Sequence, residues 1–143
     1  MKCAVFNGKC NMTIDEREIP EPAADEVLIK IMACGVCGSD VHIFFGDQGS
    51  TSSIPPLIQG HEFSGVVESV GSDVTRFKVG DHVSVNPTVT KGQVPDDVDV
   101  YDGYSFIGLS TDGGFTSRVN VPEENLYHLP EDFSLELAAT IEP

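Results

Sequence analysis

The sequence predicts a mainly β protein, built as a small β-barrel with a few short helices. Three observations support this class. Short runs of alternating apolar and polar residues recur along the chain, as in half-buried strands. Turn residues separate these runs, and the 143-residue chain contains 14 Gly and 9 Pro. Helix signals are few and short, which together with many short strands is typical of a small barrel.

The first half of the chain begins with strand signals. Asn7-Gly8 lies between two apolar runs and predicts a hairpin turn there. Ile19-Pro20-Glu21-Pro22 then interrupts the ladder, because proline lacks a backbone donor. We expect strands over residues 3–6, 12–18 and 26–32, followed by a short helix over 39–45 that stops at Gly46.

The second half continues with short strands and one final helix. Ser134 predicts an N-cap, with Glu136 in the first helical turn. Residues 87–112 are the least regular part and include the acidic stretch 96–99, so we expect a surface lobe there and not a core element. We expect strands over 63–70, 81–85, 115–121 and 125–129, and a helix over 134–140.

Length and charge limit the classes of function. The length suits one domain. The net charge is −15, from 23 acidic and 8 basic residues, which excludes a nucleic-acid-binding class that needs a basic face. Either a well-solvated surface or adaptation to high salt explains the acidity.

No apolar run approaches a membrane span, and the N-terminus has no apolar signal region, so we expect a cytoplasmic protein.

The four cysteines, at positions 3, 10, 34 and 37, are too few for the disulfide framework of a small secreted scaffold. Cys34 and Cys37 have the spacing of a redox pair. The βαβ pattern that surrounds thioredoxin-type pairs is not predicted around them, so a redox pair is disfavoured.

Two segments carry the side chains that hold zinc. Residues 37–42, Cys-Gly-Ser-Asp-Val-His, and residues 60–62, Gly-His-Glu, supply thiol, imidazole and carboxylate groups. In a β-barrel, two loop ends can share one rim. Three such ligands plus an open position make a catalytic zinc site, whereas structural zinc prefers four closed ligands.

Five motifs, in order and at the expected spacings, resemble those of the zinc-dependent medium-chain alcohol and polyol dehydrogenases. The resemblance covers almost the whole chain and implies the family's N-terminal catalytic domain, a GroES-like partly open β-barrel. The closing Ile-Glu-Pro is most similar to the sorbitol, galactitol-phosphate and butanediol branch. The motifs are Gly35-Val36-Cys37-Gly38-Ser39-Asp40, Gly60-His61-Glu62-Phe63-Ser64-Gly65, Val79-Gly80-Asp81-His82-Val83, Asp112-Gly113-Gly114-Phe115 and Ile141-Glu142-Pro143.

The resemblance implies a set of zinc ligands. Cys37, His61 and Glu62 are similar to the family's catalytic zinc ligands. Glu142 is similar to the carboxylate that binds this zinc directly or through water. Asp40 resembles the carboxylate that orients the imidazole of His61, as metal-bound histidines require.

The resemblance also implies the reaction. The family oxidises a polyol or secondary alcohol by hydride transfer to NAD(P). Ser39 resembles the hydroxyl that takes the substrate proton, and His42 the group that passes it outward. On spacing alone, Ser39 and His42 would be a helix cap and a half-exposed side chain, and His82 and His128 have the structural interpretation.

The chain departs from the family in two ways. The family lobe carries four closely spaced cysteines for a structural zinc, and residues 87–112 contain none, so we expect one catalytic zinc only. A Gly-x-Gly-x-x-Gly fingerprint is absent from the sequence, so we expect residues 1–143 to be one catalytic domain without its nucleotide-binding domain. Such a fragment should bind zinc without turnover and self-associate, while the full-length enzyme forms a homo-oligomer.

Two other functions stay open. One is a non-catalytic GroES-like binding module, and the other is a zinc-free quinone-reductase-type domain. Neither needs the combination of Cys37, His61 and Glu62, so metal binding discriminates between them and the dehydrogenase.

Overall fold

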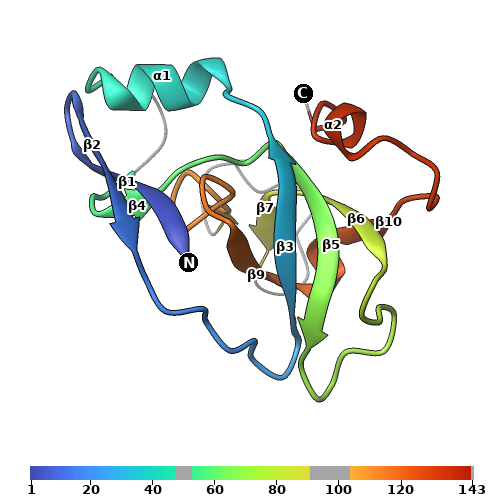
Figure 1. The fold of residues 1–143 in the computed structure, drawn as a ribbon. Helices are drawn as coiled ribbons and strands as arrows, with labels where there is room; N and C mark the ends of the chain where they lie inside the picture. Colours follow the sequence, from blue (N-terminus) through green and yellow to red (C-terminus); the bar gives the residue numbers. More distant parts are fainter. Residues whose placement is uncertain (48–52, 91–103, 143) are drawn as a thin grey trace, which may run out of the picture.

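The structure is a computed structural model that describes residues 1–47, 53–90 and 104–142. Ten strands and two short helices lie in this part of the chain, with one turn of 3-10 helix, η1 (Figure 1). In chain order they are β1 (Lys2–Gly8), β2 (Asn11–Glu16), β3 (Glu26–Cys34), α1 (Gly38–Phe44), β4 (Leu57–Ile58), β5 (Phe63–Val70), β6 (His82–Val85), β7 (Thr88–Thr90), β8 (Tyr104–Phe106), β9 (Arg118–Pro122), η1 (Glu123–Asn125), β10 (Leu126–His128) and α2 (Leu135–Ala138).

The strands form three antiparallel sheets. A five-stranded sheet has the order β10-β6-β5-β3-β9, a three-stranded sheet the order β2-β1-β4, and β7 pairs with β8. The sheets do not close into a full barrel, which confirms the mainly β, partly open GroES-like barrel predicted from the sequence. Among the described residues, no helix is long and apolar enough to span a membrane.

The long antiparallel pair of β3 and β5 forms the centre of the fold (Figure 1). Val27 and Ile29 of β3 and Phe63 and Val67 of β5 are almost fully buried, because alternate residues of each strand point to the same side. They belong to one apolar core cluster.

Helix α2 packs on β3 and β5, and Ser64 Oγ donates to the Leu135 carbonyl at 2.5 Å. The N-cap predicted at Ser134 is present, since its Oγ accepts from the Leu137 amide at 3.2 Å.

The first hairpin turns later than the sequence predicted. Gly8 pairs with Asn11, so the turn lies at Lys9-Cys10 and not at Asn7-Gly8. The reason is a tertiary contact. Cys10 takes a left-handed conformation, with φ of 55°, and its amide donates to the Phe44 carbonyl at the end of α1 at 2.7 Å.

The expectation of a surface lobe over residues 87–112 is wrong at Ile107 and Leu109, which are buried at 3% and 8% exposure. Strands β7 and β8 of this region pair antiparallel. The short strand β4 was not predicted either. The strand expected over 115–121 is shortened to β9 because Phe115 bonds with Gln59 and Ala4 before β9 begins. The acidic stretch 96–99 lies outside the described residues.

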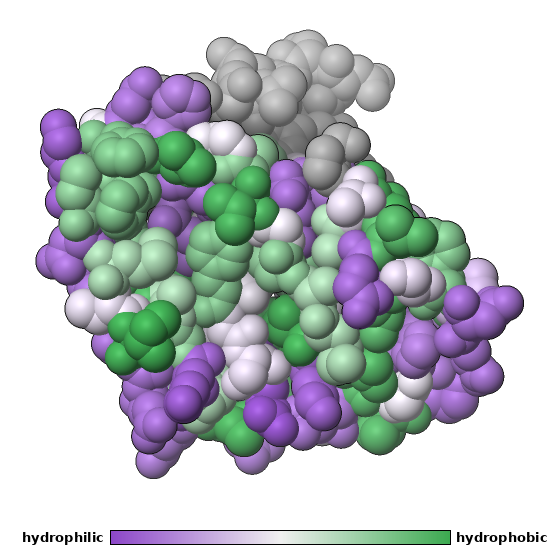
Figure 2. All heavy atoms as spheres, turned by 45° about the horizontal axis from the view of Figure 1, so that its top comes forward, coloured by the Kyte–Doolittle hydropathy of each residue, from purple (hydrophilic) through white to green (hydrophobic). Residues whose placement is uncertain are grey.

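Large apolar side chains are exposed on both helices and beside them. Figure 2, which brings the top of Figure 1 forward, shows hydrophobic residues over much of the middle of this face. Both helices lie at this top (Figure 1). The exposed apolar residues on or beside α1 and α2 are Val36, Val41, Phe45, Phe133, Leu137 and Ile141.

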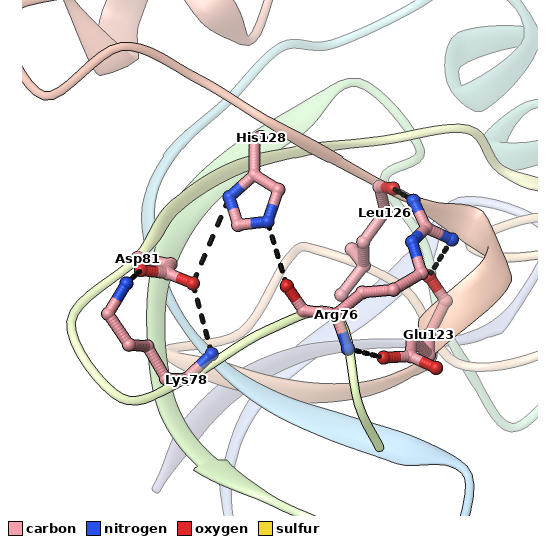
Figure 3. Close-up of polar contacts among 6 residues, drawn as sticks. All are labelled: Arg76, Lys78, Asp81, Glu123, Leu126 and His128. Carbon is pink, nitrogen blue, oxygen red and sulfur yellow. Dashed lines mark hydrogen bonds and ion pairs between the residues drawn. The ribbon is translucent and has the colours of Figure 1, made fainter.

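Away from the helices, a polar cluster ties the β5–β6 connection to β10 (Figure 3). We call it the edge clasp; its residues are Arg76, Lys78, Asp81, Glu123, Leu126 and His128. The Arg76 guanidinium donates to the carbonyls of Leu126 and Glu123, at 3.2 and 3.5 Å, and the Glu123 carboxylate accepts from the Arg76 amide. His128 lies 2.9 Å from the Arg76 carbonyl and stacks on Phe77, with ring centroids 4.3 Å apart. This places His128 in the structural role that the sequence suggested.

Candidate metal centre

The candidate site lies where β3 ends and β5 begins, at the top of Figure 1 between the two helices. Cys37 is the residue before α1, with extended φ and ψ of −76° and 158°. His61 and Glu62 follow Gly60, whose φ of 93° turns the chain toward β5. The Gly35 amide donates to the Glu62 carbonyl at 2.7 Å, so the two loops are bonded to one another. The barrel rim therefore brings both predicted segments together.

Cys37, His61 and Glu62 form the metal-ligand cluster found among the described residues. One ligand atom from each lies within 4.8 Å of the other two. His61 is buried at 4% exposure, while Cys37 and Glu62 are half-buried. Gly35 makes room for this arrangement, because a Cβ there would overlap the Glu62 carboxylate. Thiolate, imidazole and carboxylate on a partly open face fit a zinc ion with a free coordination position.

Asp40 lies behind this cluster and is buried at 3% exposure. Its carboxylate accepts from the Cys37 amide at 3.0 Å and the Gly60 amide at 3.4 Å. Asp40 Oδ1 is 3.8 Å from His61 Nδ1, an ionic contact beyond hydrogen-bond distance. Burial raises the pKa of Asp40, while the Cys37 amide, His61 and the Gly60 amide oppose this rise. The carboxylate thus connects both ligand-bearing loops.

Backbone hydrogen bonds fix the segment between β4 and β5 that carries His61. The amides of Gly113, Gly114 and Phe115 donate to the carbonyls of Ile58, Gly60 and Gln59, at 2.7, 2.7 and 2.8 Å. Glycine is required at position 113, where a Cβ would overlap the Gly60 carbonyl. The Gly-Gly-Phe motif therefore fixes the main chain just before His61 by three backbone hydrogen bonds.

Ser39 and His42 have different surroundings on α1. Ser39 Oγ is buried and has no hydrogen-bond partner within the described part of the chain. The His42 side chain is 71% exposed, and its Nδ1 lies 3.6 Å from Asp47 Oδ2. Ser39 is two residues from Cys37, whereas His42 faces solvent. The structure brings neither into the metal-ligand cluster.

Glu142 is exposed and is not among the three clustered ligands. It lines a cavity of about 450 Å³ together with Ser84, Tyr127, His128 and Ile141. The structure therefore places Glu142 beside the cavity next to β6 and β10 and leaves its predicted role as a zinc ligand untested.

Cys34 takes no part in the cluster. Its thiol is partly buried against the positions of Gly60 and Gly114. Burial, with smaller effects of Asp40 and Glu62, raises the pKa of Cys34 to about 12. A thiol with so high a pKa carries almost no thiolate near neutral pH, which agrees with the rejection of a redox pair.

Sequence reasoning missed Gln59. This side chain is fully buried, at 0% exposure, and its Nε2 donates to the Asp40 carbonyl at 3.4 Å. A signal was present, because Gln59 is a polar residue directly after the apolar pair Leu57-Ile58 and directly before the ligand loop.

Comparison with known proteins identifies relatives of this chain. Residues 23–131 match the family described as Alcohol dehydrogenase GroES-like domain. Sorbitol dehydrogenase from Bacillus subtilis is 37% identical over 149 residues, covering 100% of this chain and 42% of that protein.

Two solved structures are similar in fold and sequence. Galactitol-1-phosphate dehydrogenase from Escherichia coli has a TM-score of 0.88 and 34% identity, covering 99% of this chain and 42% of the other. The short chain alcohol dehydrogenase rspB from Escherichia coli CFT073, complexed with NADH, has a TM-score of 0.87 and 36% identity over 99% of this chain and 42% of the other.

The chain therefore spans about two fifths of the length of these relatives. Within that span the match includes both ligand-bearing loops and the strands that hold them, since residues 23–131 contain Cys37, His61 and Glu62. This chain belongs to the alcohol dehydrogenase GroES-like domain family.

Proposed function

We propose that this chain is the zinc-binding catalytic part of an enzyme that oxidises a polyol or secondary alcohol with NAD(P). The observation that carries the proposal is the convergence of Cys37, His61 and Glu62 within 4.8 Å on a partly open rim. The relatives are alcohol and polyol dehydrogenases, and rspB is known in complex with NADH. In this proposal NAD(P) binds to a part of the full-length enzyme outside residues 1–143.

The three clustered side chains would hold one zinc ion. His61 Nδ1 lies on the side of Asp40, which leaves Nε2 as the nitrogen for the metal. We propose that Glu142 supplies a fourth ligand, directly or through water. We expect no second, structural zinc, because residues 87–112 contain no cysteine.

Zinc, when bound, supplies a Lewis acid that lowers the pKa of an alcohol hydroxyl. The chain's own residues then orient the substrate and remove its proton. Ser39 Oγ has free hydrogen-bonding capacity two residues from Cys37, so we propose that it accepts this proton. His42 is exposed on the same short helix and would pass the proton to solvent. Asp40, with its carboxylate fixed by two backbone amides, keeps the imidazole of His61 in place.

Metal analysis of three proteins tests the zinc site. The wild-type chain is compared with Cys37→Ser, which removes a ligand, and Cys10→Ser, which replaces an exposed free cysteine outside the cluster. We expect about one zinc per chain in wild type and Cys10→Ser and none in Cys37→Ser. Two zinc ions per chain would refute the single-zinc proposal. No zinc after reconstitution would favour a GroES-like binding module or a quinone-reductase-type domain.

An assay of alcohol oxidation tests whether residues 1–143 need the rest of the full-length enzyme for turnover. We expect no oxidation of sorbitol by residues 1–143 with NAD⁺ or NADP⁺, and turnover by the full-length protein. Turnover by the fragment alone would show that it binds the cofactor and would overturn this division of roles.

The apolar side chains exposed on and beside α1 and α2 also bear on assembly. We propose that the full-length enzyme is a cytoplasmic homo-oligomer and that the isolated fragment self-associates through this apolar surface. Gel filtration over a range of concentrations tests this, and a monomer at the highest concentration would contradict it.

A further inference from the structure

Gln59 is a fully buried amide between the two loops that carry the metal ligands. It follows the buried strand β4 and precedes Gly60-His61. Its backbone carbonyl accepts from the Phe115 amide at 2.8 Å, so the main chain at this position is fixed from the side of the Gly-Gly-Phe motif. The side chain extends to α1, where Nε2 donates to the Asp40 carbonyl at 3.4 Å.

Gln59 and Asp40 connect the same two elements in opposite directions. The Asp40 carboxylate, from α1, accepts the Gly60 amide of the His61 loop at 3.4 Å. The Gln59 amide, from the His61 loop, donates to the main chain of α1. Two hydrogen bonds at neighbouring positions restrict sliding and rotation of one element against the other more than either bond alone. Cys37 directly precedes α1 and His61 follows Gly60, so this double connection bears on the separation of two ligands.

Packing alone does not explain an amide here. Gln59 Oε1 is buried and has no hydrogen-bond partner in residues 1–47, 53–90 and 104–142. An unpaired buried acceptor costs free energy, and a leucine of similar volume would fill the space without that cost. The gain from the amide must therefore lie in its directed bond to Asp40.

We propose that Gln59 is a positioning residue that holds Cys37 and His61 at the separation that one metal ion requires. It touches neither metal nor substrate and acts through Asp40 and the backbone of α1. This inference rests on the proposed zinc site and adds a residue that sets its geometry.

The test compares Gln59→Leu with a matched buried amide elsewhere. Asn125 is 3% exposed and also has an unpaired Oδ1, but its Nδ2 donates to the carbonyls of Asn86 and Thr88, away from the metal ligands. Zinc affinity is measured on the 143-residue chain by competition with a chromophoric chelator. The absorption spectrum of the Co²⁺-substituted protein reports the ligand geometry, and urea unfolding of the metal-free protein reports stability.

We expect Gln59→Leu to weaken zinc affinity about tenfold and change the Co²⁺ spectrum, with little change in the metal-free unfolding midpoint. Asn125→Ala should lower that midpoint and leave zinc affinity and the Co²⁺ spectrum unchanged. If Gln59→Leu does not fold, Gln59→Met gives an unbranched apolar side chain of similar length.

The outcomes separate the two proposals. Wild-type affinity and spectrum in the Gln59 variants would overturn the positioning role while leaving the zinc site intact. A wild-type chain that binds no zinc would refute the proposed site itself, and the positioning role with it.

Discussion

Two histidine–aspartate pairs in this fold have the same separation and opposite surroundings. His61 Nδ1 and Asp40 Oδ1 are 3.8 Å apart in the candidate metal centre, with 5% and 4% of their side chains exposed. His128 Nδ1 and Asp81 Oδ2 are also 3.8 Å apart, in the edge clasp (Figure 3), with 51% and 12% exposed. The distance between the partners therefore does not distinguish the two sites.

The two sites differ in the direction in which the pKa of the carboxylate is shifted. Desolvation raises the pKa of Asp40, whereas the hydrogen bond from Lys78 lowers the pKa of Asp81. A buried carboxylate is held by fixed backbone donors, here the amides of Cys37 and Gly60. Asp81 accepts one backbone amide, from Lys78, and its charged partner is the Lys78 side chain, which is 82% exposed to solvent and so contributes less. The comparison predicts that substitutions in the candidate metal centre change stability and zinc affinity strongly. Substitutions in the edge clasp should change them little.

The largest difference is expected between Asp40→Ala and Asp81→Ala. Asp40→Ala leaves two backbone donors without an acceptor, and we expect a loss of about 2 kcal/mol of unfolding free energy. If Asp40 orients His61 as proposed, zinc affinity should fall about 10- to 100-fold. Asp81→Ala should cost about 1 kcal/mol and leave zinc affinity unchanged. Urea unfolding of the metal-free proteins and chelator competition measure both quantities.

Asp40→Asn provides the control for that comparison. Its amide oxygen can still accept one backbone hydrogen bond, so stability should fall less than in Asp40→Ala while zinc affinity still decreases. Equal zinc affinity in Asp40→Ala and Asp81→Ala would show that burial does not set the difference between the two pairs.

A smaller effect is expected from a single added methyl group beside the metal ligands. In Gly35→Ala the new Cβ would overlap Glu62 Oε2 and displace that carboxylate, so we expect zinc affinity to fall about tenfold. Gly38→Ala is the matched control, because a Cβ at Gly38 meets no atom within 4 Å among the described residues. Chelator competition measures both, and an unchanged affinity in Gly35→Ala would mean that Glu62 is not a ligand.

The sequence alone allowed the convergence of the three candidate ligands to be predicted better than the contacts that support them. Cys37, His61 and Glu62 occur in short motifs whose residue types are characteristic of zinc sites, so those motifs were enough to predict that the three side chains converge. The proposed role of Gln59 depends on its contact with the Asp40 carbonyl, and that of Gly35 on the room it leaves for the Glu62 carboxylate. Those neighbours come from distant parts of the chain, so the one local signal, a polar Gln59 after the apolar pair Leu57-Ile58, does not reveal them.

The same reason explains the errors in the fold. Strands β3 and β5 have a strong alternating pattern, and both were predicted close to their observed bounds. The hairpin turn moved to Lys9-Cys10 because Cys10 contacts Phe44, and Ile107 is buried because its segment returns to the core. Local sequence patterns predict elements that are determined locally, and tertiary contacts decide the rest.

The pH dependence of the edge clasp gives a smaller effect. The pKa of Asp81 is lowered in the fold from its usual value of 3.8, so ionised Asp81 stabilises the protein above about pH 4. This contribution decreases as the pH falls through the lowered pKa. Metal-free Asp81→Asn should therefore be about 1 kcal/mol less stable than wild type at pH 7, with the difference vanishing once the pH lies below the lowered pKa of Asp81. A difference that persists in acid would show that Asp81 acts through packing and not through its charge.

The smallest effect should come from Lys78, whose side chain lies largely in solvent. Its Nζ lies 2.7 Å from Asp81 Oδ1, but 82% of its side chain is exposed to solvent. Lys78→Met keeps the aliphatic length and the backbone hydrogen bond from position 78 to Asp81, and it removes only the charge. We expect a slight decrease of the thermal midpoint at low salt that disappears in about 1 M NaCl, where exposed charges are screened within a few ångströms. Differential scanning calorimetry at both salt concentrations measures this. A large decrease that resists salt would mean that the clasp is as strongly coupled to the fold as the buried pair at Asp40, and that exposure is a poor guide to the strength of either site.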